Sequence, residues 1–318
     1  MKNLTKALVT MGVLLVNVPL FAQPEDGLDF TVNRYASARG WDVNAYWLVA
    51  ENGVVLIDAL LRNSDAMNMV ALIRATGKPL RGVVLTHPHP DHYGGLQVLR
   101  EELGEFPVYA TQATADTLSA VHEEFMQNVD PQMKDDIYTV LVRPDHIVAS
   151  GETVEIAGIP LLFDDLGPGE APDNAVIYQP NKKILFTGDS TIHHKHYYIG
   201  EVRSKRSLEQ LHYMKEHYSD ATVFLTGHGD PARPSILDQH IEYIETFRLL
   251  LRDTLADSAN LTSEKDHLTE AAREIYAKTI IDQYPYLGDY GFDAARLIIF
   301  FLPKVETEIL AEGNAATN

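Results

Sequence analysis

Four side chains that can bind metal ions fall within six positions of this sequence, in the run Thr86-His87-Pro88-His89-Pro90-Asp91-His92-Tyr93-Gly94-Gly95. His87 and His89 both precede a proline, which pushes the preceding residue toward an extended conformation. Residues two apart in an extended segment point the same way, so we expect these two imidazoles to face one metal ion. Asp91 and His92 lie where a helix can begin, and we expect the turn to direct them toward a second, neighbouring ion.

Three later strands are expected to end in glycine-rich turns, each of which contains an acidic residue or a histidine. These residues are Glu170 in Gly167-Pro168-Gly169-Glu170, Asp189 in Gly188-Asp189 and His228 in Gly227-His228-Gly229. Loops at strand ends hold side chains on a rigid base, so all three are candidates for the same site. Asp58 follows a strand expected at 54–57 and is a candidate for orienting a ligand imidazole. It is equally suited to begin the following turn.

The pattern of apolar residues predicts a core of two sheets with helices outside. A hairpin is expected at Asn52-Gly53, within residues 45–58. Strands are expected at 82–86, 108–110, 153–156, 160–166, 175–179, 184–187 and 223–226, and helices at 64–76, 96–102, 112–128 and 206–218.

From Ser235 onward the sequence is predicted to be helical, with helices at 235–257, 264–280 and 293–302 and an aromatic-rich stretch at 284–292. We therefore expect a leader at 1–22, a main domain at 23–235 and a helical extension at 236–318. The extension is expected to pack on the core, and the alternative is a lid over the site or a dimerisation arm.

The composition excludes several classes of protein. The chain has 318 residues and no cysteine, which rules out disulfides, thiolate zinc sites and cysteine nucleophiles. Acidic residues outnumber basic ones 45 to 26, and this formal charge of −19 argues against nucleic acid as a partner.

The N-terminus predicts export. Lys2 and Lys6 accompany the apolar run Ala7–Phe21, as in a secretory signal peptide cut after Ala22. The alternative is a membrane anchor, but the run is shorter than the roughly 20 residues that a membrane span needs. We expect an exported protein, in a bacterial periplasm, that has no membrane attachment once the signal is cleaved.

In this order and spacing, the His-x-His-x-Asp-His run, the Gly-Asp after an apolar strand and the Gly-His-Gly after another resemble the metallo-β-lactamase superfamily. The resemblance covers about residues 28–235. It implies an α/β fold, an αββα sandwich with a two-metal site at one edge, here followed by the C-terminal helical extension. It says little about the substrate, because the superfamily hydrolyses lactams, thioesters, lactones, sulfate esters and phosphoesters.

The resemblance also implies which residues bind the metals. Metal one would be held by His87, His89 and the residue at Glu170, metal two by Asp91, His92 and His228, and Asp189 would bridge them. The superfamily usually has histidine at the position of Glu170. The Glu-Ala-Pro found here is similar to the alkylsulfatase branch, and the alternative is a water molecule in place of this ligand.

The glutamate changes the charge of the site. Two divalent cations, three carboxylates and a bridging hydroxide are formally neutral, whereas histidine at position 170 would leave one positive charge. Zinc is the cofactor expected first, and the oxygen ligands make manganese or iron alternatives. The two ions would activate a water molecule as hydroxide, and Asp91 would be the catalytic residue that orients it.

Residues that contact the substrate are harder to predict. Many metallo-β-lactamases bind the substrate carboxylate with a lysine three residues beyond the bridging position, where this chain has Ile192. Candidates to line the mouth of the site or to polarise a substrate oxygen are His193, His194, Lys195, His196 and Asn174. A polar surface loop and ordinary turn chemistry are the alternatives.

The sequence thus predicts an exported dinuclear metal-dependent hydrolase that acts on a small molecule, at an amide, lactam or ester-type bond, in the manner of a β-lactamase. A lactonase or an alkylsulfatase-like ester hydrolase is the alternative. A non-catalytic metal-binding protein is the alternative from another class, and Asp91 argues against it because a structural metal site needs no acid to orient water.

Overall fold

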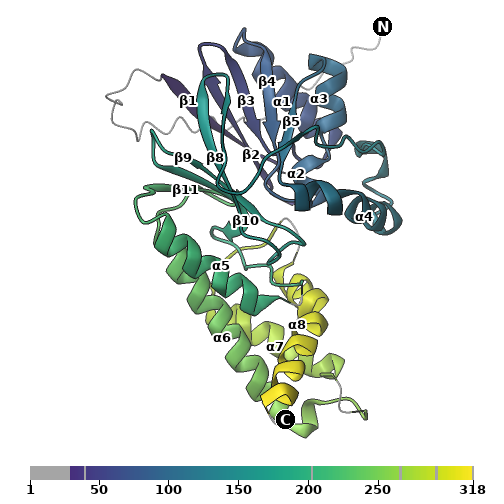
Figure 1. Ribbon diagram of the computed structural model, residues 1–318. Coiled ribbons are helices and arrows are strands. Elements are labelled where there is room, and N and C mark those ends of the chain that lie inside the picture. Colours follow the sequence, from purple (N-terminus) through teal and green to yellow (C-terminus); the bar gives the residue numbers. More distant parts are fainter. Residues whose placement is uncertain (1–28, 39–40, 202, 265–266, 291–292, 317–318) are drawn as a thin grey trace, which may run out of the picture.

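Two β-sheets face each other and helices cover their outer faces, as the αββα prediction requires (Figure 1). The computed structural model describes residues 29–38, 41–201, 203–264, 267–290 and 293–316, so the signal peptide expected at 1–22 lies outside the described residues. None of the described helices combines the length and apolar character needed to cross a bilayer.

The first sheet has the strand order β1-β2-β3-β4-β5-β6. Its strands are β1 (Phe30–Ala36), β2 (Asn44–Ala50), β3 (Gly53–Ile57), β4 (Leu80–Val84), β5 (Val108–Ala110) and β6 (His146–Ile147). The first three pair antiparallel, with the expected hairpin between β2 and β3, and the strands from β3 to β6 pair in parallel. The sequence pattern does not indicate β1, because polar residues interrupt its apolar positions.

The second sheet has the order β11-β10-β9-β8-β7. Its strands are β7 (Thr153–Ile156), β8 (Ile159–Asp165), β9 (Ala175–Gln179), β10 (Ile184–Ile192) and β11 (Val223–His228). β10 and β11 pair in parallel, while the others pair antiparallel. β10 runs beyond the expected 184–187, and its pairing with β11 shifts register on both sides of Gly188, which bends the strand where Asp189 follows.

The continuous apolar strands are explained by burial on both faces of each sheet. Successive side chains of a strand point to opposite faces. Ile57 and Phe186 belong to the cluster between the sheets, whereas Leu56 packs toward the helices over the first sheet and Leu185 toward those over the second. This alternation creates the layers of the sandwich.

The helices are α1 (Asn63–Ala75), α2 (Pro90–Tyr93), α3 (Leu96–Leu103), α4 (Gln112–Asn128), α5 (Ser204–His217), α6 (Ile236–Ala256), α7 (Glu270–Gln283) and α8 (Ala294–Ala316), with short 3-10 turns η1 (Lys134–Asp136) and η2 (Ser258–Asn260). α1 and α3 pack in the cluster on the first sheet. α5 to α8 pack with the second sheet in one continuous cluster, so the helical extension rests on the core (Figure 1).

Two boundaries in the extension differ from the prediction. α7 begins at Glu270 rather than 264, because the Thr269 side chain accepts a hydrogen bond from the Ala272 N–H and caps the helix. α8 continues through Pro303 to Ala316, although proline removes a helical hydrogen bond. The buried side chains on both sides of Pro303, including Phe301 and Val305, keep the helix against the core.

Phe247 provides a test of how firmly the extension is joined to the sandwich. It is fully buried on α6, and its ring centroid lies 5.1 Å from that of Tyr276 on α7 and 5.7 Å from that of Phe301 on α8. We predict that Phe247→Ala lowers the free energy of unfolding by about 3–5 kcal/mol. Because this cluster is continuous with the second sheet, tryptophan fluorescence and helical circular dichroism should still report one shared transition.

The matched control is Leu249→Ala on the same helix, since Leu249 is 57% exposed. Its effect should stay below about 0.5 kcal/mol. Loss of helical signal at lower denaturant, with unchanged tryptophan fluorescence, would show instead that the extension unfolds separately.

Candidate metal centre

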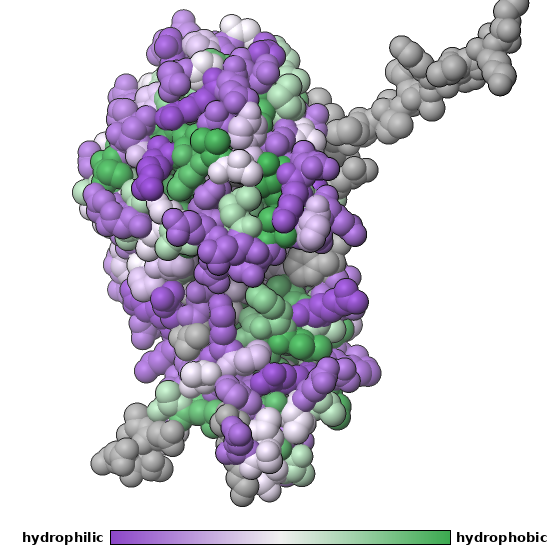
Figure 2. Space-filling model, turned by 90° about the vertical axis from the view of Figure 1, so that its right-hand side faces the viewer, coloured by the Kyte–Doolittle hydropathy of each residue, from purple (hydrophilic) through white to green (hydrophobic). Residues whose placement is uncertain are grey.

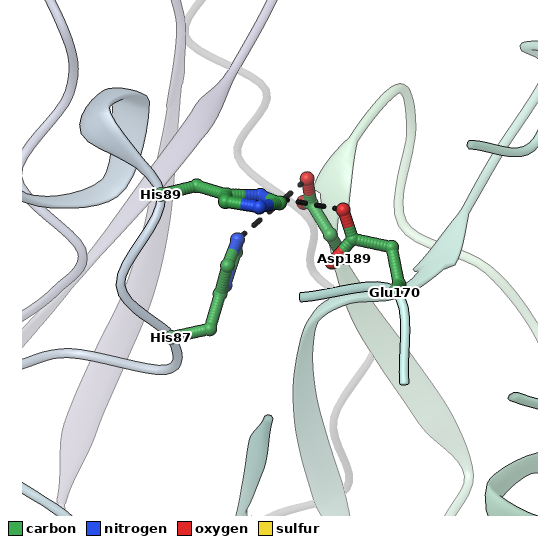
Figure 3. Close-up of side chains that lie close together, drawn as sticks. All are labelled: His87, His89, Glu170 and Asp189. Carbon is green, nitrogen blue, oxygen red and sulfur yellow. Dashed lines mark ion pairs between the residues drawn. The ribbon is translucent and has the colours of Figure 1, made fainter. Parts of the chain in front are cut away.

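The predicted ligands gather at one edge of the sandwich, where the parallel strands of both sheets end. His87 and His89 lie in the loop that follows β4, and Asp91 and His92 begin α2. The second sheet supplies its ligands from the β8–β9 turn and from the ends of β10 and β11. Figure 3 shows the two sides meeting, with the histidines on one side and Glu170 and Asp189 on the other.

One group of donors consists of His87, His89, Glu170 and Asp189, whose ligand atoms all lie within 4.8 Å of one another. His89 Nδ1 is 3.3 Å from Glu170 Oε1, and His87 Nε2 is 3.8 Å from Asp189 Oδ2 (Figure 3). Glu170 is 1% exposed and its side chain is directed at this group. It is thus placed as the third ligand would be, and not as a solvated loop acid.

A second group consists of Asp91, His92, Asp189 and His228, again with ligand atoms within 4.8 Å. His228 Nε2 is 3.1 Å from Asp189 Oδ2 and 3.3 Å from Asp91 Oδ2, and His92 Nε2 is 3.3 Å from Asp189 Oδ1. Asp189 belongs to both groups. Its carboxylate is therefore placed to bridge two cations.

The chain orients the imidazoles from behind. The Nδ1 atoms of His92 and His228 lie 2.8 Å from the Asp58 carboxylate and 2.9 Å from the Trp41 carbonyl, respectively. His87 Nδ1 lies 3.0 Å from the Thr86 hydroxyl. Each of these oxygen atoms can accept the Nδ1 proton, in which case the Nε2 lone pair is free to bind a cation at the centre of the site.

Several donor atoms at the centre have no hydrogen-bond partner among the described residues. They are His87 Nε2, His92 Nε2, Glu170 Oε2 and Asp189 Oδ1, all buried. Unpaired buried polar atoms are costly, and nitrogen and carboxylate oxygen donors in this arrangement suit zinc or a similar divalent ion. The residues present therefore fit a metal centre.

The electrostatics of the site follow from packing acids against imidazoles away from water. Burial lowers the pKa of His92, but the carboxylates of Asp189, Asp58 and Asp91 outweigh burial and raise this pKa well above its ordinary value. Burial likewise lowers the pKa of His228, while Asp189 and Asp91 raise it to about 10. Carboxylates that hold a proton so firmly on these rings exert the same attraction on a metal cation.

Glycines allow the strands to approach this closely. A Cβ atom on Gly227 would lie 1.8 Å from Asp189 Oδ1, and one on Gly188 would lie 2.6 Å from the Thr86 hydroxyl. Gly188 also has a φ of 49°, which disfavours other residues. The Gly-Asp and Gly-His-Gly turns are thus required by the close packing of the two sheets around the ligands.

A cavity of about 540 Å³ opens onto the metal-binding side chains. Besides the predicted ligands His89, Asp91, Glu170, Asp189 and His228, it is lined by Trp41, Ile192, Tyr198, Tyr290, Arg296, Leu297 and Phe300. The sequence did not predict any residue of this second set as part of the site, and Ile192 was noted only as the position where a substrate-binding lysine is absent. The aromatic-rich stretch at 284–292, which contains Tyr290, is the one signal that could have indicated them.

The predicted substrate-binding residues of the loop after β10 are not among those that line this cavity. His193 and His194 stack with ring centroids 3.7 Å apart, and Lys195 Nζ binds the Asp42 carboxylate at 2.9 Å. His196 is buried against the helical extension.

Asn174 does not line the cavity either. It is 1% exposed, and its Nδ2 atom donates to the Ala171 carbonyl at 3.4 Å within the turn that presents Glu170. The same turn is held from outside by Gln210 on α5, which donates to the Gly167 carbonyl at 2.8 Å. Asn174 is therefore part of the support of Glu170.

Asp58 lies next to a candidate ligand imidazole, that of His92, on the side away from the cavity. This is the first of the two roles expected for it, the orientation of a ligand imidazole. Its carboxylate accepts hydrogen bonds from the Thr86 N–H and hydroxyl, both at 2.9 Å, in addition to facing His92. We predict that Asp58→Asn weakens zinc binding by about 10–100-fold, because the amide no longer fixes the imidazole as well. Competition with a chromogenic chelator measures this affinity.

The control for this variant is Asp65→Asn, since Asp65 is another buried aspartate, with hydrogen bonds from Tyr35 at 2.7 Å and Ser37 at 2.6 Å. That change should lower the free energy of unfolding and leave zinc affinity within about twofold of the unmodified protein. Equal zinc affinity in both variants would contradict the orienting role of Asp58.

Comparison with known proteins agrees with this geometry. The family profile described as the metallo-beta-lactamase superfamily matches residues 38–254. An alkyl/aryl-sulfatase of Saccharomyces cerevisiae is 26% identical over 219 residues, which cover 57% of this chain but only 33% of the sulfatase. The metallo-beta-lactamase IND-1 of Chryseobacterium indologenes is 27% identical over 194 residues, which cover 60% of this chain and 73% of that protein.

Solved structures extend the likeness of fold beyond the sandwich. A metallo-beta-lactamase family protein of Thermus thermophilus superposes with a TM-score of 0.63 at 19% identity, covering 90% of this chain and 94% of that one. At this identity the likeness concerns the fold alone. Together with the family match over most of the sandwich, it shows that this chain belongs to the metallo-β-lactamase superfamily.

Proposed function

We propose that this protein is an exported dinuclear metal-dependent hydrolase that cleaves an amide, lactam or ester-type bond in a small molecule. The observation that carries the proposal is the pair of donor groups that share Asp189 and open into one cavity. A purely structural site is closed by its ligands, whereas a catalytic one leaves room for a substrate.

The cofactor would be two divalent ions, with zinc first and manganese or iron as alternatives. One would be held by His87, His89 and Glu170, and the other by Asp91, His92 and His228, with Asp189 between them. Bound there, such ions supply Lewis acidity that lowers the pKa of water and polarises a substrate oxygen.

The chain's own residues support the reaction in two ways. Asp91 is 3% exposed, lines the cavity and has a carboxylate that can accept a proton from an attacking water molecule. Trp41, Tyr198 and Tyr290 surround the same space and limit the access of bulk water to the reacting bond. The strongly acidic chain and the small cavity favour a small-molecule substrate over nucleic acid.

Ester or sulfate-ester hydrolysis is the second candidate, and a specific observation favours it. Glu170 lies in one donor group with His87 and His89, and the chain is similar to a protein named an alkyl/aryl-sulfatase. A carboxylate at this position makes the loaded centre less positive than a histidine would, which reduces the attraction for any anionic substrate and favours an uncharged ester over an anionic lactam.

We predict that the purified protein binds up to two divalent ions per chain and hydrolyses at least one of nitrocefin, 4-nitrophenyl esters, lactones and alkyl sulfates. Asp91→Ala should lower kcat/KM by at least about a hundredfold, because the proton acceptor is lost. His89→Ala should also lose metal, as measured by mass spectrometry. The preferred substrate in the panel decides between lactam and ester chemistry.

The control is His146→Ala, which removes an imidazole that is 52% exposed on β6 and should keep full activity. Full hydrolytic activity in both Asp91→Ala and His89→Ala would contradict a catalytic role for this metal centre. A full metal content without turnover of any substrate would favour the non-catalytic metal-binding protein instead.

Export is proposed from the sequence of residues 1–22 alone. We predict that expression in a Gram-negative host yields a periplasmic protein whose N-terminus, determined by mass spectrometry, is Gln23. Replacing Lys2 and Lys6 by glutamate should retain the uncut chain in the cytoplasm. A full-length chain in the cytoplasm of the unmodified strain, or one anchored in the inner membrane, would contradict the proposal.

A further inference from the structure

The cavity is closed on one side by the helical extension. Arg296, Leu297 and Phe300 lie in the first two turns of α8, and all three line the same space as the metal-binding side chains. Phe300 is 69% exposed, so its ring stands at the mouth of the cavity, while the ligands at its base are buried. Figure 2 shows hydrophobic side chains gathered partway down an otherwise largely hydrophilic face, at the level of α8.

Arg296 is the one lysine or arginine among the described residues that line this cavity. It has no carboxylate partner in the described part of the chain. The two acids nearest to it in sequence form hydrogen bonds with backbone groups at the start of α8. Asp289 accepts from the Ala294 N–H at 2.8 Å, and Asp293 accepts from the Ala295 N–H at 2.7 Å.

Of the described arginines that have no acid partner, which also include Arg81, Arg143, Arg203 and Arg233, Arg296 alone lines the cavity. Other arginines of this chain, in which acidic residues outnumber basic ones 45 to 26, are paired. Arg34, Arg74 and Arg248, for example, all pair with carboxylates at 2.7–2.9 Å. The guanidinium group is planar and more weakly hydrated than an ammonium, so it binds carboxylate and similar oxyanions through two parallel hydrogen bonds. Arg296 retains all of these donors for a ligand.

We propose that Arg296 binds an anionic group of the substrate, and that the substrate joins this anion to an apolar body. The aromatic and aliphatic wall between the buried ligands and Arg296 suits such a body, which loses contact with water when it enters. The anion would therefore be set apart from the bond that is cleaved, with the bond at the base of the cavity and the anion at α8. This inference rests on the proposed hydrolase function only for the cleavage of the bond at the base of the cavity. Binding of the anion by Arg296 does not depend on that function.

The test uses matched pairs of substrates with the metal-loaded protein. Each pair consists of the 4-nitrophenyl half-ester of a straight-chain dicarboxylic acid and the same compound with its free carboxyl group capped as a methyl ester. A series of chain lengths is used to find the span between the two ends of the site. The unmodified protein should prefer the free carboxylate at one chain length by about tenfold in kcat/KM.

Arg296→Gln should abolish this preference by raising KM for the carboxylate substrate, with kcat and the capped substrate changed by less than about twofold. Arg296→Lys should restore part of it, because the positive charge returns without the planar fork. The matched control is Arg233→Gln, since Arg233 is exposed, lies outside the cavity and carries the same charge. A preference that Arg296→Gln leaves intact would overturn the inference.

A binding measurement separates failure of this inference from failure of the proposed function. Titration calorimetry compares octanedioate with its monomethyl ester, neither of which has to be cleaved. The diacid should bind about tenfold more tightly in the unmodified protein and in Arg233→Gln, and no more tightly than the monoester in Arg296→Gln. Equal binding of both compounds by the unmodified protein contradicts the role of Arg296, whether or not any ester is hydrolysed.

Discussion

Three carboxylates and three imidazoles are buried together at one edge of this protein, and a fourth imidazole, that of His89, is partly exposed beside them. Much of the surrounding structure compensates for the cost of burying these groups. Asp91, Glu170 and Asp189 are 3%, 1% and 5% exposed. Isolated buried charges are destabilising by several kcal/mol each. Divalent cations held among them would offset these carboxylates, so metal binding and stability would be coupled in this fold.

The two sheets are also tied together beside the centre. Asn44 and Tyr46 on β2 both donate to the Thr226 carbonyl on β11, at 2.9 Å and 2.8 Å. Each sheet contributes part of the ligand set, so the distance between the sheets determines the distance between the ligands. A substitution that separates β2 from β11 would therefore act on the metal centre without touching a ligand.

The helical extension packs on the second sheet and also lines the cavity. Its apolar cluster is continuous with the outer face of the second sheet, and the same packing brings the start of α8 to the cavity. The sandwich supplies the candidate metal ligands, whereas the extension supplies Tyr290, Arg296, Leu297 and Phe300 to the wall of the cavity.

The sandwich and the candidate ligands could be predicted from the order of residues alone, because their signals are local. Proline restricts the backbone at His87 and His89, and continuous apolar strands end in glycine turns next to Glu170, Asp189 and His228. Which other residues reach the site depends on how the elements pack in three dimensions. Lys195 follows β10 closely yet does not line the cavity, whereas Arg296 is far away in sequence and reaches it through the packing of α8 on the second sheet. Such contacts depend on the relative placement of whole elements, which no local pattern of residues encodes.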